Sequence, residues 1–123
     1  MSHGEYIRIK NTKNSIQASG KSVSVEYQDP ETGMFCMYIP SLQLHSYGDT
    51  MEEAEEMLDE SMKMFFDNLF TSSLKKIESE LYRLGWSKKK FKQKEFFPIV
   101  DLEERLKEEK IENYKVSELN IAA

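Results

Sequence analysis

The stretch SLQLHSYGDTMEEAEEMLDESMKMFFDNL, residues 41–69, joins a Gly-Asp-Thr turn to a long amphipathic helix. Thr50 and Glu53 form the T-x-x-E pattern of a capping box, which predicts that the helix begins directly after Thr50. Apolar residues then recur at spacings of three and four, as on one face of a helix. They are Met51, Ala54, Met57, Leu58, Met62, Phe65, Phe66 and Leu69. We therefore predict one buried helix face, with Phe65 on it.

The residues before this helix predict an antiparallel sheet. Residues 22–27 alternate apolar and polar side chains, as a half-buried strand does. The segment DPETG at 29–33 has the Pro and Gly of a hairpin loop, and residues 34–39 form the return strand. Both faces of this return strand are apolar, which places it inside the sheet. Further short strands are expected at residues 6–10 and 44–47.

The residues after position 70 predict two more helices and further strands. A second apolar stripe runs to Gly85, a typical helix C-cap, and Trp86 follows as a packing anchor. Residues 87–94 form a lysine-rich connector, and Pro98 places the next strand at an edge of the sheet or makes it irregular. The expected elements are a strand at 96–100, a helix at 102–110 capped by Asp101, and a strand at 114–121.

Length, charge and cysteine content limit the class of protein. A chain of 123 residues with 39% hydrophobic residues predicts one globular domain. We divide it into an N-terminal strand and turn (1–21), a core (22–70) and a C-terminal extension (71–123). The single cysteine allows no internal disulfide, which is typical of a reducing compartment. No apolar run approaches the roughly 18 residues of a membrane span, so we expect a cytoplasmic protein.

Charge is segregated along the chain. Seven acids and no base lie between positions 49 and 60, whereas eight bases lie between positions 75 and 94. The acids on the predicted helix are a candidate docking surface for a basic partner. The residues that we assign to partner binding are Glu52, Glu53, Glu56, Asp59 and Glu60. A metal site is disfavoured, because no histidine stands at the spacing that di-iron bundles use.

The segment KKKFKQK at 88–94 is a candidate contact for nucleic acid, because lysines with an interleaved aromatic residue can hold phosphates. The alternative is a solvated connector. The lysines concerned are Lys88, Lys89, Lys90, Lys92 and Lys94.

Two side chains were weighed as catalytic groups. His45 has neither a nucleophile nor an orienting acid at a known spacing, so a structural role is favoured over a general base. Cys36 lies mid-strand between Phe35 and Met37, which favours a buried structural thiol over a nucleophile. No Gly-rich phosphate loop, zinc spacing or serine elbow is present. We expect no enzymatic activity, no cofactor and no metal.

The segment from position 22 to 70 resembles the HicB-like antitoxins. Their pattern is a strand ending in Pro-x-Leu, then Gly-Asp-Thr-x-Glu-Glu-Ala and an amphipathic helix. The matching residues here are Phe35, Pro40, Leu42, Gly48, Asp49, Thr50, Glu52, Glu53, Ala54 and Glu60. The resemblance implies an α+β, truncated ribonuclease-H-like fold: a β-β-β-α-β core of an antiparallel sheet on a long helix, here with a C-terminal helix and strand extension.

The resemblance also implies a function. A HicB-like antitoxin, or a solitary relative, neutralises a small basic ribonuclease toxin by binding it and catalyses nothing. Of the strand residues at 23–27 and 34–39 only Glu26 is acidic, whereas a two-metal nuclease site needs several converging acids. Neither a helix-turn-helix nor a ribbon-helix-helix is evident, so DNA binding is not expected. The alternative is an oligomeric assembly module without a toxin. Exposed strand edges and the apolar residues Met64, Phe66 and Phe70 predict a homodimer or higher oligomer.

Overall fold

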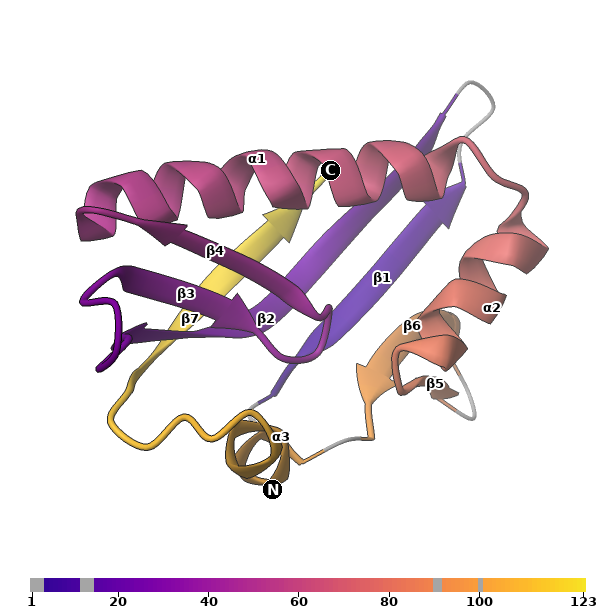
Figure 1. Ribbon diagram of the computed structural model, residues 1–123. Coiled ribbons are helices and arrows are strands. Elements are labelled where there is room, and N and C mark those ends of the chain that lie inside the picture. Colours follow the sequence, from indigo (N-terminus) through magenta and orange to yellow (C-terminus); the bar gives the residue numbers. More distant parts are fainter. Residues whose placement is uncertain (1–3, 12–14, 90–91, 100) are drawn as a thin grey trace.

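The computed structural model describes the backbone of residues 4–11, 15–89, 92–99 and 101–123. These residues form one antiparallel sheet of seven strands with three helices, so the predicted α+β class is confirmed (Figure 1). The elements in chain order are β1 (Tyr6–Asn11), β2 (Ile16–Gln28), β3 (Phe35–Ile39), β4 (Leu44–Gly48), α1 (Met51–Phe70), α2 (Leu74–Arg83), β5 (Trp86–Lys89), β6 (Lys92–Pro98), α3 (Leu102–Glu108) and β7 (Lys115–Ala122).

The long strand β2 divides the sheet. The strand order is β4-β3-β2-β1-β6-β5, and β7 pairs with β2 as well. Residues 19–21 of β2 pair with both β1 and β7, and Val25 and Glu26 pair with both β3 and β7. Since a strand has only two edges, β7 occupies one edge of β2 alone. The other edge holds β1 on its first half and β3 on its second half, so the sheet forks between them.

Buried polar groups fill this fork. Val23 lies between the two paired segments, and its N–H donates to Oε1 of Glu5 at 2.9 Å instead of to a strand. The same oxygen accepts hydrogen bonds from the hydroxyls of Ser22 at 2.9 Å and Ser41 at 3.0 Å. The indole Nε1 of Trp86 donates to the Ser41 carbonyl at 2.7 Å. Glu5 therefore stabilises the fork by accepting hydrogen bonds from buried donors that have no partner in a neighbouring strand.

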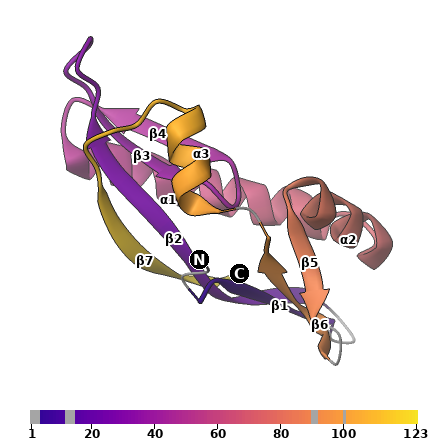
Figure 2. The same cartoon turned by 90° about the horizontal axis from the view of Figure 1, so that it is seen from below.

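Helices cover both faces of the sheet (Figure 2). On one face, α1 and α2 pack on the larger core, which includes Ile7, Ile39 and Trp86. On the other face, α3 packs Leu102 and Leu106 on a second core with Val23, Val25 and Tyr38. The successive residues Tyr38 and Ile39 of β3 thus enter different cores. The prediction that β3 is internal is confirmed, since it pairs with β2 and β4.

The start of α1 follows the predicted capping box in part. The Thr50 hydroxyl accepts from the N–H of Glu53 at 3.2 Å. The Glu53 carboxylate reaches back to the N–H of Asp49 at 2.9 Å, one residue before the usual partner in a capping box.

The buried face of α1 differs from the prediction at its C-terminal half. Phe66 is 2% exposed, which confirms its place on the predicted buried stripe and removes it from the apolar residues expected to drive assembly. Phe70, another of those residues, is half-buried. Phe65 packs against the core as predicted, but it is only half-buried. Met64 is 65% exposed, as expected of a residue off the stripe.

The second half of the chain confirms three elements and corrects two. Helix α2, helix α3 with its Asp101 cap, and strand β7 lie where the sequence predicts them. The prediction of a connector at 87–94 is wrong for its described residues, because residues 87–89 belong to β5 and residues 92–94 to β6, and these two strands pair with each other. The edge position inferred from Pro98 is also wrong, since β6 lies between β1 and β5. Pro98 is tolerated because it is the last residue of β6.

Candidate protein-binding surfaces

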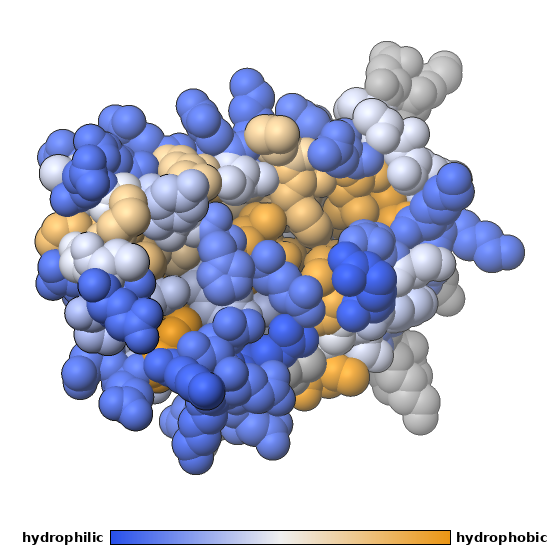
Figure 3. All heavy atoms as spheres, viewed as in Figure 1, coloured by the Kyte–Doolittle hydropathy of each residue, from blue (hydrophilic) through white to orange (hydrophobic). Residues whose placement is uncertain are grey.

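The acidic half of α1 is exposed to solvent. All five acids assigned to partner binding are exposed: Glu52, Glu53, Glu56, Asp59 and Glu60. Asp49 and Glu55 are exposed as well. Figure 3 shows hydrophilic side chains along the outer side of α1. Helical spacing places Glu52, Glu56 and Glu60 in one row along this surface. The structure therefore brings the predicted residues together into one continuous surface, which we call the acidic face.

The charges of the acidic face are not neutralised by ion pairs with the described residues. In the part of the chain that the structure describes, none of these carboxylates lies within 4.0 Å of a lysine or arginine nitrogen. The single base on α1, Lys63, is exposed and makes no such contact there either. The helix dipole favours acids in the first turn, but it does not reach Glu56, Asp59 or Glu60. Their charge is therefore available to an external cation.

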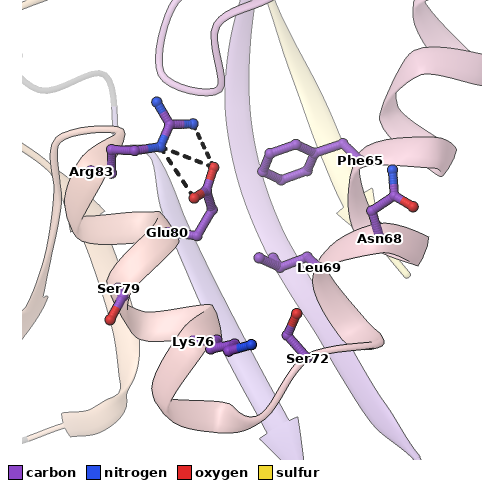
Figure 4. A pocket seen from close by; sticks show the side chains of 8 residues that line it. All are labelled: Phe65, Asn68, Leu69, Ser72, Lys76, Ser79, Glu80 and Arg83. Atoms are coloured by element: carbon purple, nitrogen blue, oxygen red, sulfur yellow. Dashed lines mark hydrogen bonds and ion pairs between the residues drawn. The ribbon is translucent and has the colours of Figure 1, made fainter.

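A groove of about 590 Å³ lies between α1 and α2 (Figure 4). Phe65 and Leu69 of α1 supply its apolar side, and Lys76 of α2 stands at its polar rim. Arg83 also lines the groove, and its Nε donates to Oε2 of Glu80 at 3.1 Å, which holds the pKa of Glu80 below its usual range. The groove follows the helix that carries the acidic face, and sequence periodicity missed it because it depends on how α2 packs.

The lysine-rich segment forms the hairpin β5–β6. Nζ of Lys88 lies 2.6 Å from Oε1 of Glu78, so its charge is already partnered. Lys89 belongs to β5, and Lys92 and Lys94 belong to β6. The side chains of these three lysines, and Lys90 altogether, lie outside the described residues. The prediction of a nucleic-acid contact here therefore stays a prediction.

The two side chains weighed as catalytic groups have local contacts. The His45 ring stacks on Tyr38 with 4.0 Å between ring centroids. Burial lowers the pKa of His45, a larger effect than the opposing influence of Glu109. Cys36 is half-buried, less than we predicted, and its Sγ lies 3.7 Å from the Met34 carbonyl oxygen.

The stacking of His45 predicts a pH dependence of stability. A folded-state pKa below the usual 6.5 means that the unfolded chain binds the proton more readily. The stabilisation is therefore complete above that value and is lost as the pH falls toward the folded-state pKa. We expect wild type to lose more stability than His45→Gln between about pH 7.5 and pH 5.5 in urea unfolding. Parallel losses in the two proteins would contradict the assignment.

The described residues contain no group of three His, Cys, Asp or Glu side chains arranged to hold a metal ion. Within the same residues, no helix is long and apolar enough to cross a membrane. Comparison with protein-family models, curated proteins and solved structures found no match to this chain. Fold and surface together describe an α+β protein that exposes an acidic face on the N-terminal half of α1 and has a groove between the C-terminal end of α1 and α2.

Proposed function

We propose that the chain is a non-catalytic binding protein of the HicB-like antitoxin kind, which neutralises a small basic ribonuclease toxin. The observation that carries the proposal is the acidic face of α1, which is exposed and forms no ion pair with any described lysine or arginine. The resemblance of residues 22–70 to HicB-like antitoxins supplies the class of partner.

The physical basis is electrostatic complementarity. Each unpaired carboxylate keeps its hydration in the free protein and gains a counter-ion when a basic surface docks. A surface of one sign also raises the association rate by steering the partner before contact. The groove between α1 and α2 lies at the C-terminal end of the same helix, and its half-buried Phe65 offers a separate apolar contact. Charge then sets the rate and orientation of binding, while apolar burial slows dissociation.

A binding role also accounts for the polar groups that might otherwise suggest chemistry. The buried Glu5 carboxylate is occupied by three donors at the fork of the sheet. The His45 ring is stacked on Tyr38. Each has a structural task. The same proposal places the protein in the cytoplasm, where its thiol stays reduced and where a ribonuclease toxin would act. It includes no operator binding, because α3 is followed by the strand β7.

Neutralisation of a candidate toxin tests this function. The candidate is a small basic protein encoded by the gene next to this one. Its cleavage of RNA is measured with increasing amounts of the present protein. We expect inhibition that saturates at a fixed stoichiometry. Full RNA cleavage in the presence of excess protein, with no complex on gel filtration, would overturn the proposal for that partner.

A second candidate function is that of an assembly module that oligomerises without a toxin. The observation that favours it is the strand β7, which pairs with β2 on one edge only among the described residues. Edge strands of this length are ready templates for another strand.

A further inference from the structure

Strand β7 has eight residues and, among the strands that the structure describes, pairs with β2 alone, so its other edge is open there. Five of its residues are exposed (Lys115, Val116, Glu118, Asn120 and Ala122), and Val116 is 40% exposed. In Figure 2, β7 forms the outer border of the sheet beside β2. A groove of about 490 Å³ separates its C-terminal end from Phe66 and Phe70 of α1, so the helix leaves this end accessible. The edge is therefore open to a strand of another chain.

Hydrogen bonding to β2 fixes which groups of β7 are free. Ala18 and Ala123 exchange both backbone hydrogen bonds, with N···O distances of 2.8 and 2.9 Å. Bonded and non-bonded pairs alternate along an antiparallel ladder, and β7 stays in one register with β2. Residues 117, 119 and 121 therefore direct their N–H and C=O groups toward β2. Residues 116, 118, 120 and 122 direct theirs outward.

We propose that this edge binds the same edge of a second copy of the chain, as two antiparallel strands related by a two-fold axis at Leu119. In this register the outward-facing residues pair with each other. Val116 lies opposite Ala122 of the second copy, and Glu118 lies opposite Asn120, which can donate to its carboxylate. The two Leu119 side chains meet on the axis. Apolar residues thus face apolar residues and no like charges meet.

The neighbouring two-fold registers are less favourable. An axis at Glu118 sets the two Glu118 carboxylates against each other, and like charges directly opposite destabilise a sheet. An axis at Asn120 leaves Val116 beyond the end of the partner strand. Of these three registers, the axis at Leu119 alone matches the sequence of β7 to itself, which is the reason to choose a second copy over an unrelated peptide.

This dimer would place both acidic faces on the same side of one continuous sheet. Cross-strand neighbours in a sheet point to the same face, so α1 of each copy lies on a shared side. The inference deepens the assembly function and does not depend on the basic partner, because it uses β7 and not the acidic face. Such a dimer could bind two toxin molecules, or one toxin dimer with two-fold symmetry.

A proline substitution at one of the outward-facing N–H groups tests the contact. Asn120→Pro removes an outward N–H and leaves the bonds between β7 and β2 intact. The matched control, Asn120→Ala, loses the same side-chain contact with Glu118 but keeps that N–H, so the difference between the two variants reports the backbone hydrogen bonds alone. Light scattering at micromolar concentration should give twice 14.5 kDa for wild type. For Asn120→Pro we expect the dissociation constant of the dimer to be about tenfold or more above that of Asn120→Ala, since two symmetric hydrogen bonds are lost.

Disulfide cross-linking tests the register of the two β7 strands even if Asn120→Pro fails to fold. In a Cys36→Ser background, Leu119→Cys places two thiols at a non-bonded pair, where Cα atoms are about 4.5 Å apart and a disulfide can form. Ser117→Cys, on the same face, places them roughly 13 Å apart. We expect mild oxidation to link Leu119→Cys and not Ser117→Cys. A monomeric wild type would overturn both the dimer and the assembly function. A dimer that tolerates Asn120→Pro and gives no Leu119→Cys link would overturn the β7 interface alone.

Discussion

Phe66→Ala is expected to lower the free energy of unfolding by about 3–5 kcal/mol, the usual cost of removing a buried phenylalanine. Phe66 is 2% exposed and belongs to the core between α1 and the sheet. Its ring packs against Phe65 at 5.1 Å and against Phe70 at 5.8 Å between centroids. Removing it therefore leaves a cavity at the point where the C-terminal half of α1 is anchored. Urea unfolding followed by far-UV circular dichroism measures the change.

Met64→Ala is the matched control, because Met64 lies on the same helix and is 65% exposed. Its substitution should change the free energy of unfolding by no more than about 0.5 kcal/mol. Phe65→Ala should fall between the two, since Phe65 is half-buried. Equal losses for Met64→Ala and Phe66→Ala would show that the helix is rotated relative to the structure described here.

Local features of the sequence predicted α1 and the hairpin between β2 and β3. The Thr50 cap, the three- and four-residue spacing, and the Asp29–Gly33 loop each act over a few residues. In that loop the N–H of Gly33 donates to the carbonyl of Asp29 at 2.8 Å. Such features need no knowledge of distant partners, so sequence patterns capture them.

Distant contacts explain what the sequence did not predict. The first half of β2 is polar and contains Gly20, which normally argues against a strand. It is a strand because β1 and β7 pair with it on both edges. A side chain at position 20 would overlap the carbonyl oxygen of Tyr6, so the glycine serves this close approach. The fork and the β5–β6 hairpin likewise depend on residues such as Glu5 and Arg8, which lie far away in sequence.

The candidate site was predictable in part for the same reason. Charge is visible residue by residue, so the acidic face was found from the sequence. The groove at the C-terminal end of α1 requires α2 to pack near Phe65, and the role of Glu5 requires the fork. A glutamate before a short strand carries no recognisable pattern.

Charge reversal on the acidic face is expected to produce the largest functional change. Glu52, Glu56 and Glu60 form one exposed row, so replacing all three by Lys inverts the field over α1 with no loss of buried contact. The on-rate for a basic toxin should fall by about ten- to a hundredfold, within the range of electrostatic steering. Far-UV circular dichroism should stay close to wild type, apart from a small loss of dipole support near Glu52.

A matched control separates this effect from net charge. Replacing Glu103, Glu104 and Glu108 by Lys changes the net charge by the same amount, and these exposed residues lie on α3, on the opposite face of the sheet. If the acidic face binds the partner, this variant should keep an on-rate within about threefold of wild type, because only the weaker long-range field changes.

The most direct measurement is the association rate of the three proteins with the immobilised toxin at two salt concentrations. If the acidic face is the docking surface, the on-rate of the wild type should fall steeply as the salt concentration rises, and the on-rate of the α3 variant should fall similarly. The α1 variant should have a low on-rate that depends only weakly on salt. Equal on-rates for wild type and the α1 variant at both salt concentrations would contradict this docking role and remove the acidic face from the interface.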